Sequence, residues 1–127
     1  MRPRNTIQKA LIKEAVVNLK THPSAEEIYM EVIKTNPNIS KATVYRNLGI
    51  MAENGEILKI EIPNSSDRFD FNTADHFHAR CEKCDRVYDI KVPNLDILDK
   101  VKDEHFIVQG YDLVFKGICK DCREQLH

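Results

Sequence analysis

Apolar residues recur with helical spacing through the first half of the chain. The first such pattern predicts a helix over residues 6–19, with inward positions four residues apart at Ile7, Leu11, Ala15 and Leu19. His22-Pro23 interrupts this pattern. Ser24 and Glu27 then have the spacing of a capping box, so a second helix is predicted from Ala25 to about Thr35.

A third pattern predicts a helix over residues 41–53, which Ser40 can cap and Asn54-Gly55 can end. Its apolar stripe consists of Val44, Leu48 and Met51. Basic and hydrogen-bonding side chains are expected largely on the other faces, namely Lys41, Thr43, Tyr45, Arg46 and Asn47. Two helices joined by a tight turn, the second of which exposes such side chains, are typical of a helix-turn-helix.

Two short extended segments follow, over residues 56–62 and 68–71, with a turn at 63–66 between them. This pattern predicts a β-hairpin, which in this position is the wing of a winged helix. Lys59 on the wing is placed to meet a DNA phosphate. A small helical bundle with one exposed polar helix is the alternative, because helical spacing alone does not distinguish the two.

The second half of the chain contains shorter elements. Its patterns predict one short helix over residues 95–104 and strands over 75–80, 86–92, 106–109 and 113–118. The fold class expected is therefore α+β. A winged helix-turn-helix domain, residues 1–71, precedes a small α/β domain, residues 72–127.

Composition is that of a globular protein, with 42% hydrophobic and 31% charged residues in 127. No apolar run approaches the roughly 18 residues needed to span a membrane, and the basic N-terminus lacks the apolar segment of a signal peptide. We therefore expect a cytoplasmic protein.

The two halves of the chain differ in charge. Residues 1–60 carry nine Lys/Arg and six Asp/Glu (+3), and residues 61–127 carry ten Lys/Arg and fourteen Asp/Glu (−4), which gives the net charge of −1. This asymmetry suits an anion-binding module joined to a cation-binding one.

All four cysteines occur in two CxxC pairs, Cys81 with Cys84 and Cys119 with Cys122. Because nothing in the sequence indicates export, a tetrahedral structural zinc is favoured over disulfides. The gap between the pairs means that this zinc would join distant segments. A redox pair and free buried thiols are the alternatives.

Histidines and carboxylates suggest a second metal site. His76 and His78 project from one face of the predicted strand, and zinc at the cysteines would bring Asp89 near them. Asp70 ends the hairpin, and His22 lies at a helix junction. Such ligands suit Fe²⁺ or Mn²⁺, although zinc also binds them. For two of these residues there is an alternative: Asp70 is then only an exposed charge at the end of a strand, and His22 only part of a helix end. The other two histidines, His105 and His127, are expected to be ordinary surface residues.

The chain resembles the ferric-uptake-regulator family over nearly its full length. The resemblance rests on five segments in the family's order, namely HPSAEEIY at 22–29, ATVYRNL at 42–48, RFDF at 68–71, DHFHARCEKC at 75–84 and CKDC at 119–122. It implies a winged helix, a C-terminal dimerisation domain with a structural zinc held by the four cysteines, and a homodimer that represses transcription from palindromic operator DNA. Family members usually begin with a further helix ahead of the segment that starts at Met1.

Within the family, the chain is most similar to the peroxide-responsive branch. That branch's regulatory iron or manganese ligands fall on His22, Asp70, His76, His78 and Asp89. The aspartate at position 89 favours this branch, because iron-uptake regulators typically carry glutamate there. The histidine-rich site of many iron- and zinc-uptake members is absent from the sequence.

The resemblance implies that hydrogen peroxide is the signal. Iron-catalysed oxidation of His22 or His76 would release the DNA. Tyr45 and Arg46 are the expected principal DNA contacts, with Lys41, Thr43 and Asn47 as supporting contacts. The protein is not expected to be an enzyme. One rival function is a repressor that reports iron or manganese supply without oxidation chemistry. The other is a non-haem iron enzyme, because two histidines and one carboxylate also form a facial triad.

Overall fold

A computed structural model describes residues 4–20, 22–74 and 76–125 of the 127-residue chain. The chain divides into two compact units, Met1–Asp75 and His76–His127. Asp75, the first residue of a predicted strand, and His127 lie outside the described residues.

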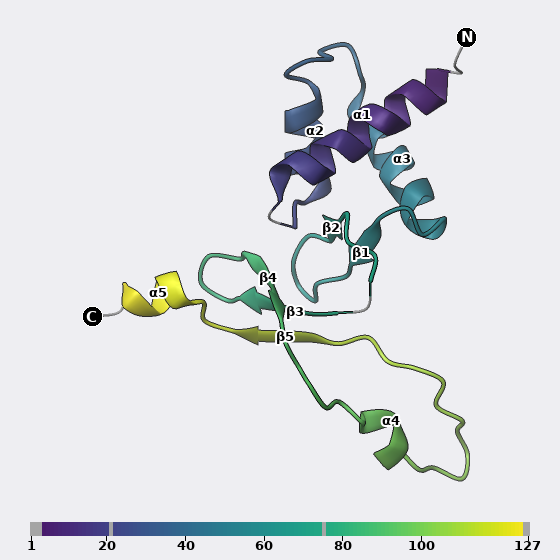
Figure 1. Cartoon of the computed structure of the whole chain (residues 1–127), viewed down its shortest axis with the longest axis vertical. Helices are drawn as coiled ribbons and strands as arrows, with labels where there is room; N and C mark the ends of the chain where they lie inside the picture. The colour runs from purple at the N-terminus through teal and green to yellow at the C-terminus, as the bar shows by residue number, and fades with distance from the viewer. Residues whose placement is uncertain (1–3, 21, 75, 126–127) are drawn as a thin grey trace. The chain divides into compact units, whose positions relative to one another are not determined.

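The first unit contains three helices followed by a two-stranded hairpin, the element order of a winged helix (Figure 1). Its elements are α1 (Arg4–Leu19), α2 (Ala25–Val32), α3 (Lys41–Glu53), β1 (Leu58–Ile60) and β2 (Arg68–Asp70). α3 has the predicted bounds, whereas α2 ends three residues before the expected Thr35, in a turn over residues 33–35.

Serine side chains cap both helices of the helix-turn-helix, as predicted. Ser24 Oγ accepts the backbone N–H of Glu27 at 3.2 Å, and the Glu27 carboxylate accepts the backbone N–H of Ser24 at 3.1 Å. Ser40 Oγ accepts the backbone N–H of Thr43 at 3.1 Å. These bonds satisfy amides that have no partner inside the helix, which fixes where α2 and α3 begin.

The core of the first unit lies between the three helices and the hairpin. Its buried members are Ile12, Ala15, Val16, Ile28, Val32, Val44, Leu48, Met51, Ile57 and Phe69. The predicted inward face of α1 was correct at Ala15, which is buried, and at Leu19, which packs against the core. It was wrong at Ile7, which is 48% exposed, whereas Ile12 is fully buried. α1 carries apolar residues around most of its circumference, so several stripes compete and packing decides which one is buried.

The hairpin is attached to the segment that joins α1 and α2. β1 and β2 are antiparallel, with Lys59 opposite Phe69. On the same strand, the backbone N–H of Phe69 donates to the carbonyl of Pro23 at 2.9 Å, and Ser24 forms a β-bridge with Arg68. β2 is thereby held against the start of α2, and all three of its residues are buried.

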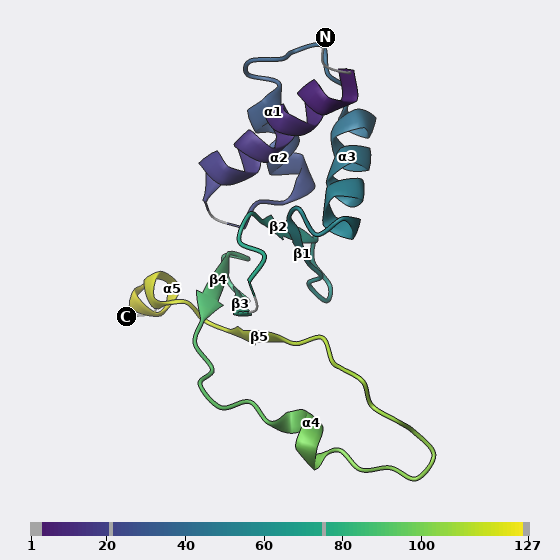
Figure 2. The same ribbon diagram turned by 45° about the vertical axis from the view of Figure 1, so that its right-hand side comes forward.

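The second unit is built on a three-stranded sheet. Its elements are β3 (Phe77–Cys81), β4 (Val87–Ile90), α4 (Ile97–Lys100), β5 (Val114–Gly117) and α5 (Lys120–Glu124). The strand order is β4-β3-β5, in which β4 is antiparallel and β5 parallel to the central strand β3. Figure 2 shows the connection from β4 to β5 as a long excursion that carries α4.

Two predicted elements of this connection differ from the structure. The strand expected over residues 106–109 was wrong, because only an isolated bridge between Asp103 and Phe106 forms there. Phe106 and Ile107 are 68% and 87% exposed, so this segment has no sheet or core to complete among the described residues. The helix expected over residues 95–104 is reduced to the single turn of α4.

No helix in the described part of the chain combines the length and apolar character that would let it cross a bilayer.

Candidate metal centres and DNA-contact residues

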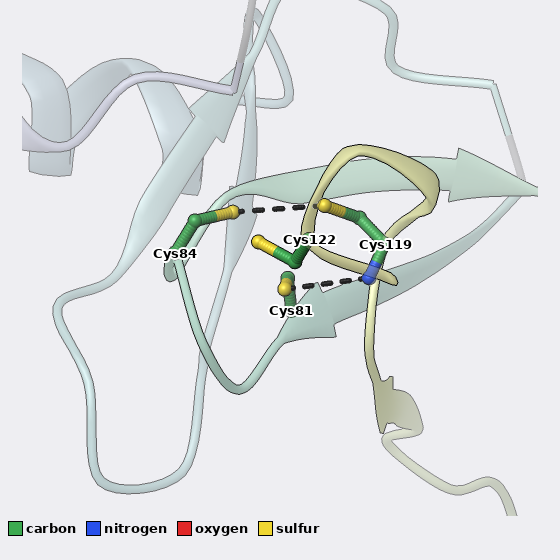
Figure 3. Close-up of side chains that lie close together, drawn as sticks. All are labelled: Cys81, Cys84, Cys119 and Cys122. Carbon is green, nitrogen blue, oxygen red and sulfur yellow. Dashed lines mark hydrogen bonds between the residues drawn. The ribbon is translucent and has the colours of Figure 1, made fainter. Parts of the chain in front are cut away.

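The four cysteines form one cluster within the second unit (Figure 3). Cys81 ends β3, Cys84 lies in the following turn, Cys119 is the N-cap of α5, and Cys122 lies within that helix. Parallel pairing of β3 with β5 sets Cys81 opposite Gly117 and so brings the second CxxC beside the first. All four are free thiols.

The spacing of the sulfurs fits zinc. Four sulfurs about 2.3 Å from a tetrahedral centre lie roughly 3.8 Å from one another. Cys84 Sγ and Cys119 Sγ are 3.8 Å apart, and all four sulfurs lie within 4.8 Å of one another. The cluster is a four-cysteine site of the zinc type, which is the arrangement predicted from the sequence.

Backbone amides favour a thiolate in this cluster. The backbone N–H groups of Cys119, Cys84 and Lys83 lower the pKa of Cys81 to about 6. The side-chain hydrogen bond with Cys119, and then burial, raise the pKa of Cys122 to about 12, because both favour the protonated thiol over a second thiolate in the cluster. A divalent cation removes this conflict and allows all four thiols to ionise.

His22 and Asp70 form a pair within the first unit. His22 Nε2 lies 3.3 Å from Asp70 Oδ2, and both side chains are about nine-tenths buried, with 10% and 8% exposed. The attachment of β2 to Pro23 and Ser24 produces this proximity. Asp70 is therefore buried, contrary to the alternative of an exposed strand-end charge, and it also accepts the backbone N–H of Asn72 at 3.0 Å.

His22 has a left-handed backbone, with φ of 48° directly before a proline. This region is unfavourable for a side-chain-bearing residue, and proline makes the preceding residue more restricted still. The structure therefore holds His22 in a costly conformation that aims its imidazole at Asp70.

His76, His78 and Asp89 form a second group, within the second unit. In the antiparallel pairing of β3 with β4, His78 lies directly opposite Asp89. Asp89 Oδ1 is 3.1 Å from His76 Nε2 and 3.3 Å from His78 Nε2, and the two imidazole centroids are 4.3 Å apart. Two imidazole nitrogens thus converge on one carboxylate oxygen, as the sequence predicted for this strand pair.

The chemistry of these donors suits a metal other than the one at the cysteines. Imidazole nitrogens and carboxylate oxygens are borderline to hard ligands, appropriate to Fe²⁺ or Mn²⁺, whereas four thiolates select zinc. The chain therefore offers a zinc-type site and separate imidazole–carboxylate sites for a regulatory metal.

The predicted DNA-contact residues are distributed over α3 and the hairpin. Tyr45, Arg46 and Lys41 are exposed on α3, Thr43 is half-buried, and Lys59 is exposed on β1. Asn47 is different: it is only 8% exposed, and its Nδ2 donates to the carbonyl of Thr43 at 2.8 Å. Its expected position on a polar, exposed face was wrong, because α3 turns this amide back onto its own backbone.

Two contacts were not anticipated from the sequence. The carboxylate of Glu26 on α2 binds both Lys41 and Tyr45. In the second unit, Cys119 and the Tyr88 hydroxyl interact. Cys119 raises the pKa of Tyr88, while the backbone N–H of Cys122 and then the Tyr88 hydroxyl lower the pKa of Cys119. Neither contact has a signal in the sequence, since each joins residues more than ten positions apart through packing of separate elements.

A winged-helix element order, a four-cysteine site and imidazole–carboxylate ligands define a metal-binding protein of the DNA-binding regulator class. The chain belongs to the ferric uptake regulator family, whose sequence profile matches residues 2–116. It is a metal-responsive transcriptional repressor and not an enzyme. Regulators of this family bind operator DNA and form dimers.

Curated relatives include the peroxide-responsive repressors PerR of Staphylococcus epidermidis and Staphylococcus aureus. The first is 36% identical over 124 residues, which cover 96% of this chain and 83% of the relative. The second is 35% identical over 124 residues, covering 96% and 84%.

Solved structures show the same fold. The peroxide stress regulator of Campylobacter jejuni aligns with a TM-score of 0.69 at 28% identity, covering 94% of this chain and 91% of that one. The ferric uptake regulator of Francisella tularensis aligns with a TM-score of 0.78 at 21% identity, covering 97% and 94%, and at that identity it shows the fold alone.

Proposed function

We propose that the protein is a cytoplasmic, peroxide-sensing repressor that binds palindromic operator DNA as a homodimer. Zinc occupies the cysteine cluster, and Fe²⁺ or Mn²⁺ is bound by His22, Asp70, His76, His78 and Asp89. The observation that carries the proposal is the pre-assembly of these five side chains into two tight groups, each within its own unit. The PerR relatives support peroxide as the signal.

A regulatory metal held by all five residues would join the two units. His22 and Asp70 belong to the helical unit, whereas the other three ligands belong to the sheet. Binding would then favour one arrangement of the DNA-binding unit over others, by the difference in metal affinity between them. In a homodimer, that arrangement would set two recognition helices about one helical turn apart, roughly 34 Å, to match two half-sites.

The chain's own residues provide the geometry for this switch. Asp70 orients the His22 imidazole, and Asp89 orients those of His76 and His78, so that these nitrogens are positioned before the metal arrives. Bound Fe²⁺ would supply the chemistry that reduces hydrogen peroxide. One oxygen atom of the peroxide would be added to an imidazole, and its second oxygen atom would leave as water. We propose His22 and His76 as the oxidised residues. Mn²⁺ would support DNA binding without this reaction.

Loss of the His22 imidazole would leave Asp70 as the single proposed ligand from the helical unit, and so would weaken the link between that unit and the sheet ligands. The left-handed backbone of His22 makes this ligand the costly one to hold. Tyr45 and Arg46 are the proposed base or phosphate contacts, with Lys41, Thr43 and Lys59 supporting them. We do not include Asn47, because its amide is buried in a bond to Thr43.

The first test is mass spectrometry of protein loaded with zinc and either Fe²⁺ or Mn²⁺, after substoichiometric peroxide. We expect one added oxygen on the peptide containing His22 or His76, with iron only. The peptide containing His105, an exposed histidine outside the proposed ligand set, is the internal control and should be unmodified. Unmodified ligand histidines with both metals would instead support a repressor that reports iron or manganese supply.

The second test is the substitution His22→Ala. It should abolish the dependence of DNA binding on Fe²⁺ or Mn²⁺ while leaving the zinc content unchanged, because the cysteine cluster is a separate site. Metal-dependent DNA binding that survives His22→Ala would refute the proposed switch.

A further inference from the structure

The N-terminus of α3 carries a positive charge where helix electrostatics disfavours one. Lys41 is the first residue of α3, beside the unpaired backbone N–H groups and the positive end of the helix dipole. Helix stability therefore does not explain a lysine at this position. Its neighbours do, because Lys41 Nζ forms an ion pair with Glu26 and lies 5.9 Å and 5.7 Å from the ring centroids of Tyr29 and Tyr45.

One carboxylate oxygen binds two of the proposed DNA contacts. Glu26 Oε2 pairs with Lys41 Nζ and accepts the Tyr45 hydroxyl at 3.1 Å. The Lys41 ammonium and then the Tyr45 hydroxyl lower the pKa of Glu26, and Glu26 in turn raises the pKa of Lys41. All three side chains are at least 40% exposed, so the cluster lies on the surface that α3 offers to a partner.

The same arrangement occurs on the hairpin. Lys59 Nζ lies 3.5 Å from Asp67 and 3.9 Å from Glu61. Glu26, Tyr45, Lys59 and Asp67 all line one surface pocket of about 370 Å³ in the first unit. Both lysines proposed to contact phosphate are thus already paired with carboxylates of the same unit.

We propose that Glu26 is a built-in competitor for DNA phosphate, which holds Lys41 and Tyr45 in an internal cluster that DNA must displace. The inference rests on the proposed role of α3 in DNA binding. Non-specific affinity comes almost entirely from phosphate contacts, so a lysine neutralised by Glu26 removes part of it. At an operator, Tyr45 gains a base partner that offsets the lost bond to Glu26. Glu26 therefore raises the preference for operator over other DNA.

The test compares Glu26→Gln with the wild type, both loaded with zinc and Mn²⁺, by fluorescence anisotropy on a random-sequence duplex and on a duplex selected by the wild type. Glutamine keeps an acceptor for Tyr45 and removes the charge. At roughly 50 mM salt we expect affinity for the random duplex to rise about 3- to 10-fold per chain, and the slope of log affinity against log salt to steepen by about 0.9 per chain. The gain should shrink by about 3.5-fold per chain between roughly 50 and 200 mM salt, and it should be smaller on the selected duplex.

Two further variants identify the cause. Glu31→Gln is the matched control, because it removes the same charge from the same helix but frees Lys34, which is not a proposed contact. It should leave affinity and slope nearly unchanged. In a Lys41→Met background, Glu26→Gln should lose its effect on the slope. Thermal unfolding of each variant verifies that the fold is retained.

The outcomes separate the inference from the function on which it rests. At roughly 50 mM salt, an unchanged or weaker affinity of Glu26→Gln for the random duplex, or an equal gain from Glu31→Gln, would overturn the inference while the wild type still binds DNA. A wild type that binds neither duplex in any metal state would overturn the inference together with the proposed function.

Discussion

Zinc removal should unfold the second unit and leave the first unit folded. Among the described residues of the second unit, only Cys81, Val87, His78 and Cys122 are buried, and Val87 is the single buried aliphatic side chain. The first unit, in contrast, has a cluster of ten buried core residues. The sheet therefore depends on the cysteine cluster far more than the helices do.

The magnitudes support this asymmetry. Full burial of a valine contributes about 1.5–3 kcal/mol, whereas a structural zinc site contributes about 10–16 kcal/mol of binding free energy at neutral pH. A unit of about 50 residues usually needs such a metal or disulfides to fold. Without zinc, Val87 cannot offset the conformational entropy of ordering β3, β4 and β5.

Hydrogen exchange followed by peptide mass spectrometry measures this directly. After chelation, or in Cys122→Ser, peptides covering Phe77–Cys81 and Val114–Gly117 should lose protection, while those covering α1 to α3 keep it. Cys122→Ser should also weaken zinc binding more than about 100-fold, because even residues that only support a ligand cost roughly 10- to 100-fold. Lys83→Ala, an exposed position between two ligands, is the matched control and should behave as the wild type. Retained protection of β3 and β5 after verified zinc loss would refute the reasoning.

Three other predictions concern single groups. Leu48→Ala should lower the unfolding free energy of the first unit by about 2–5 kcal/mol, because Leu48 is 1% exposed in the core. A loss below about 1 kcal/mol, measured by calorimetry, would contradict this packing. Asp70→Asn should weaken Mn²⁺-dependent DNA binding with normal zinc content, measured by anisotropy and metal analysis, and unchanged Mn²⁺ dependence would exclude Asp70 as a ligand. The pKa of Cys81 is lowered from 9.0 to about 6. The folding stability that its thiolate contributes is therefore complete above the ordinary pKa of 9.0 and is lost as the pH falls through about 6. Because zinc binds the thiolate, the apparent zinc affinity measured against a competing chelator should fall more steeply below that pH, and an affinity that does not depend on pH would contradict this.

The sequence predicted most successfully what is encoded locally. The capped starts of α2 and α3 depend on side chains three residues from the amides that they satisfy, and both serines behave as expected. The ligand groups were also predictable, because CxxC pairs and a His-x-His strand bring ligands together over short distances.

Features set by packing could not be predicted in the same way. The buried face of α1 was predicted only in part, with Ala15 correct and Ile7 wrong, because apolar residues surround that helix and periodicity does not select one stripe. The strand at residues 106–109 has the right composition but needs a partner strand, which the described chain does not provide. The contact of Glu26 with Lys41 and Tyr45 depends on how α2 packs against α3.

The central strand of the sheet carries residues of both proposed metal sites and so predicts an order of metal loading. β3 carries His78 near one end and Cys81 at the other, and it is hydrogen-bonded on both sides. If zinc removal unfolds this sheet, as predicted above, the pairing that sets Asp89 opposite His78 is lost with it. We therefore expect zinc to bind before the proposed regulatory ligands on this sheet acquire their geometry. A zinc-deficient preparation that fails to respond to iron or peroxide would accordingly report incomplete maturation rather than an absent sensor.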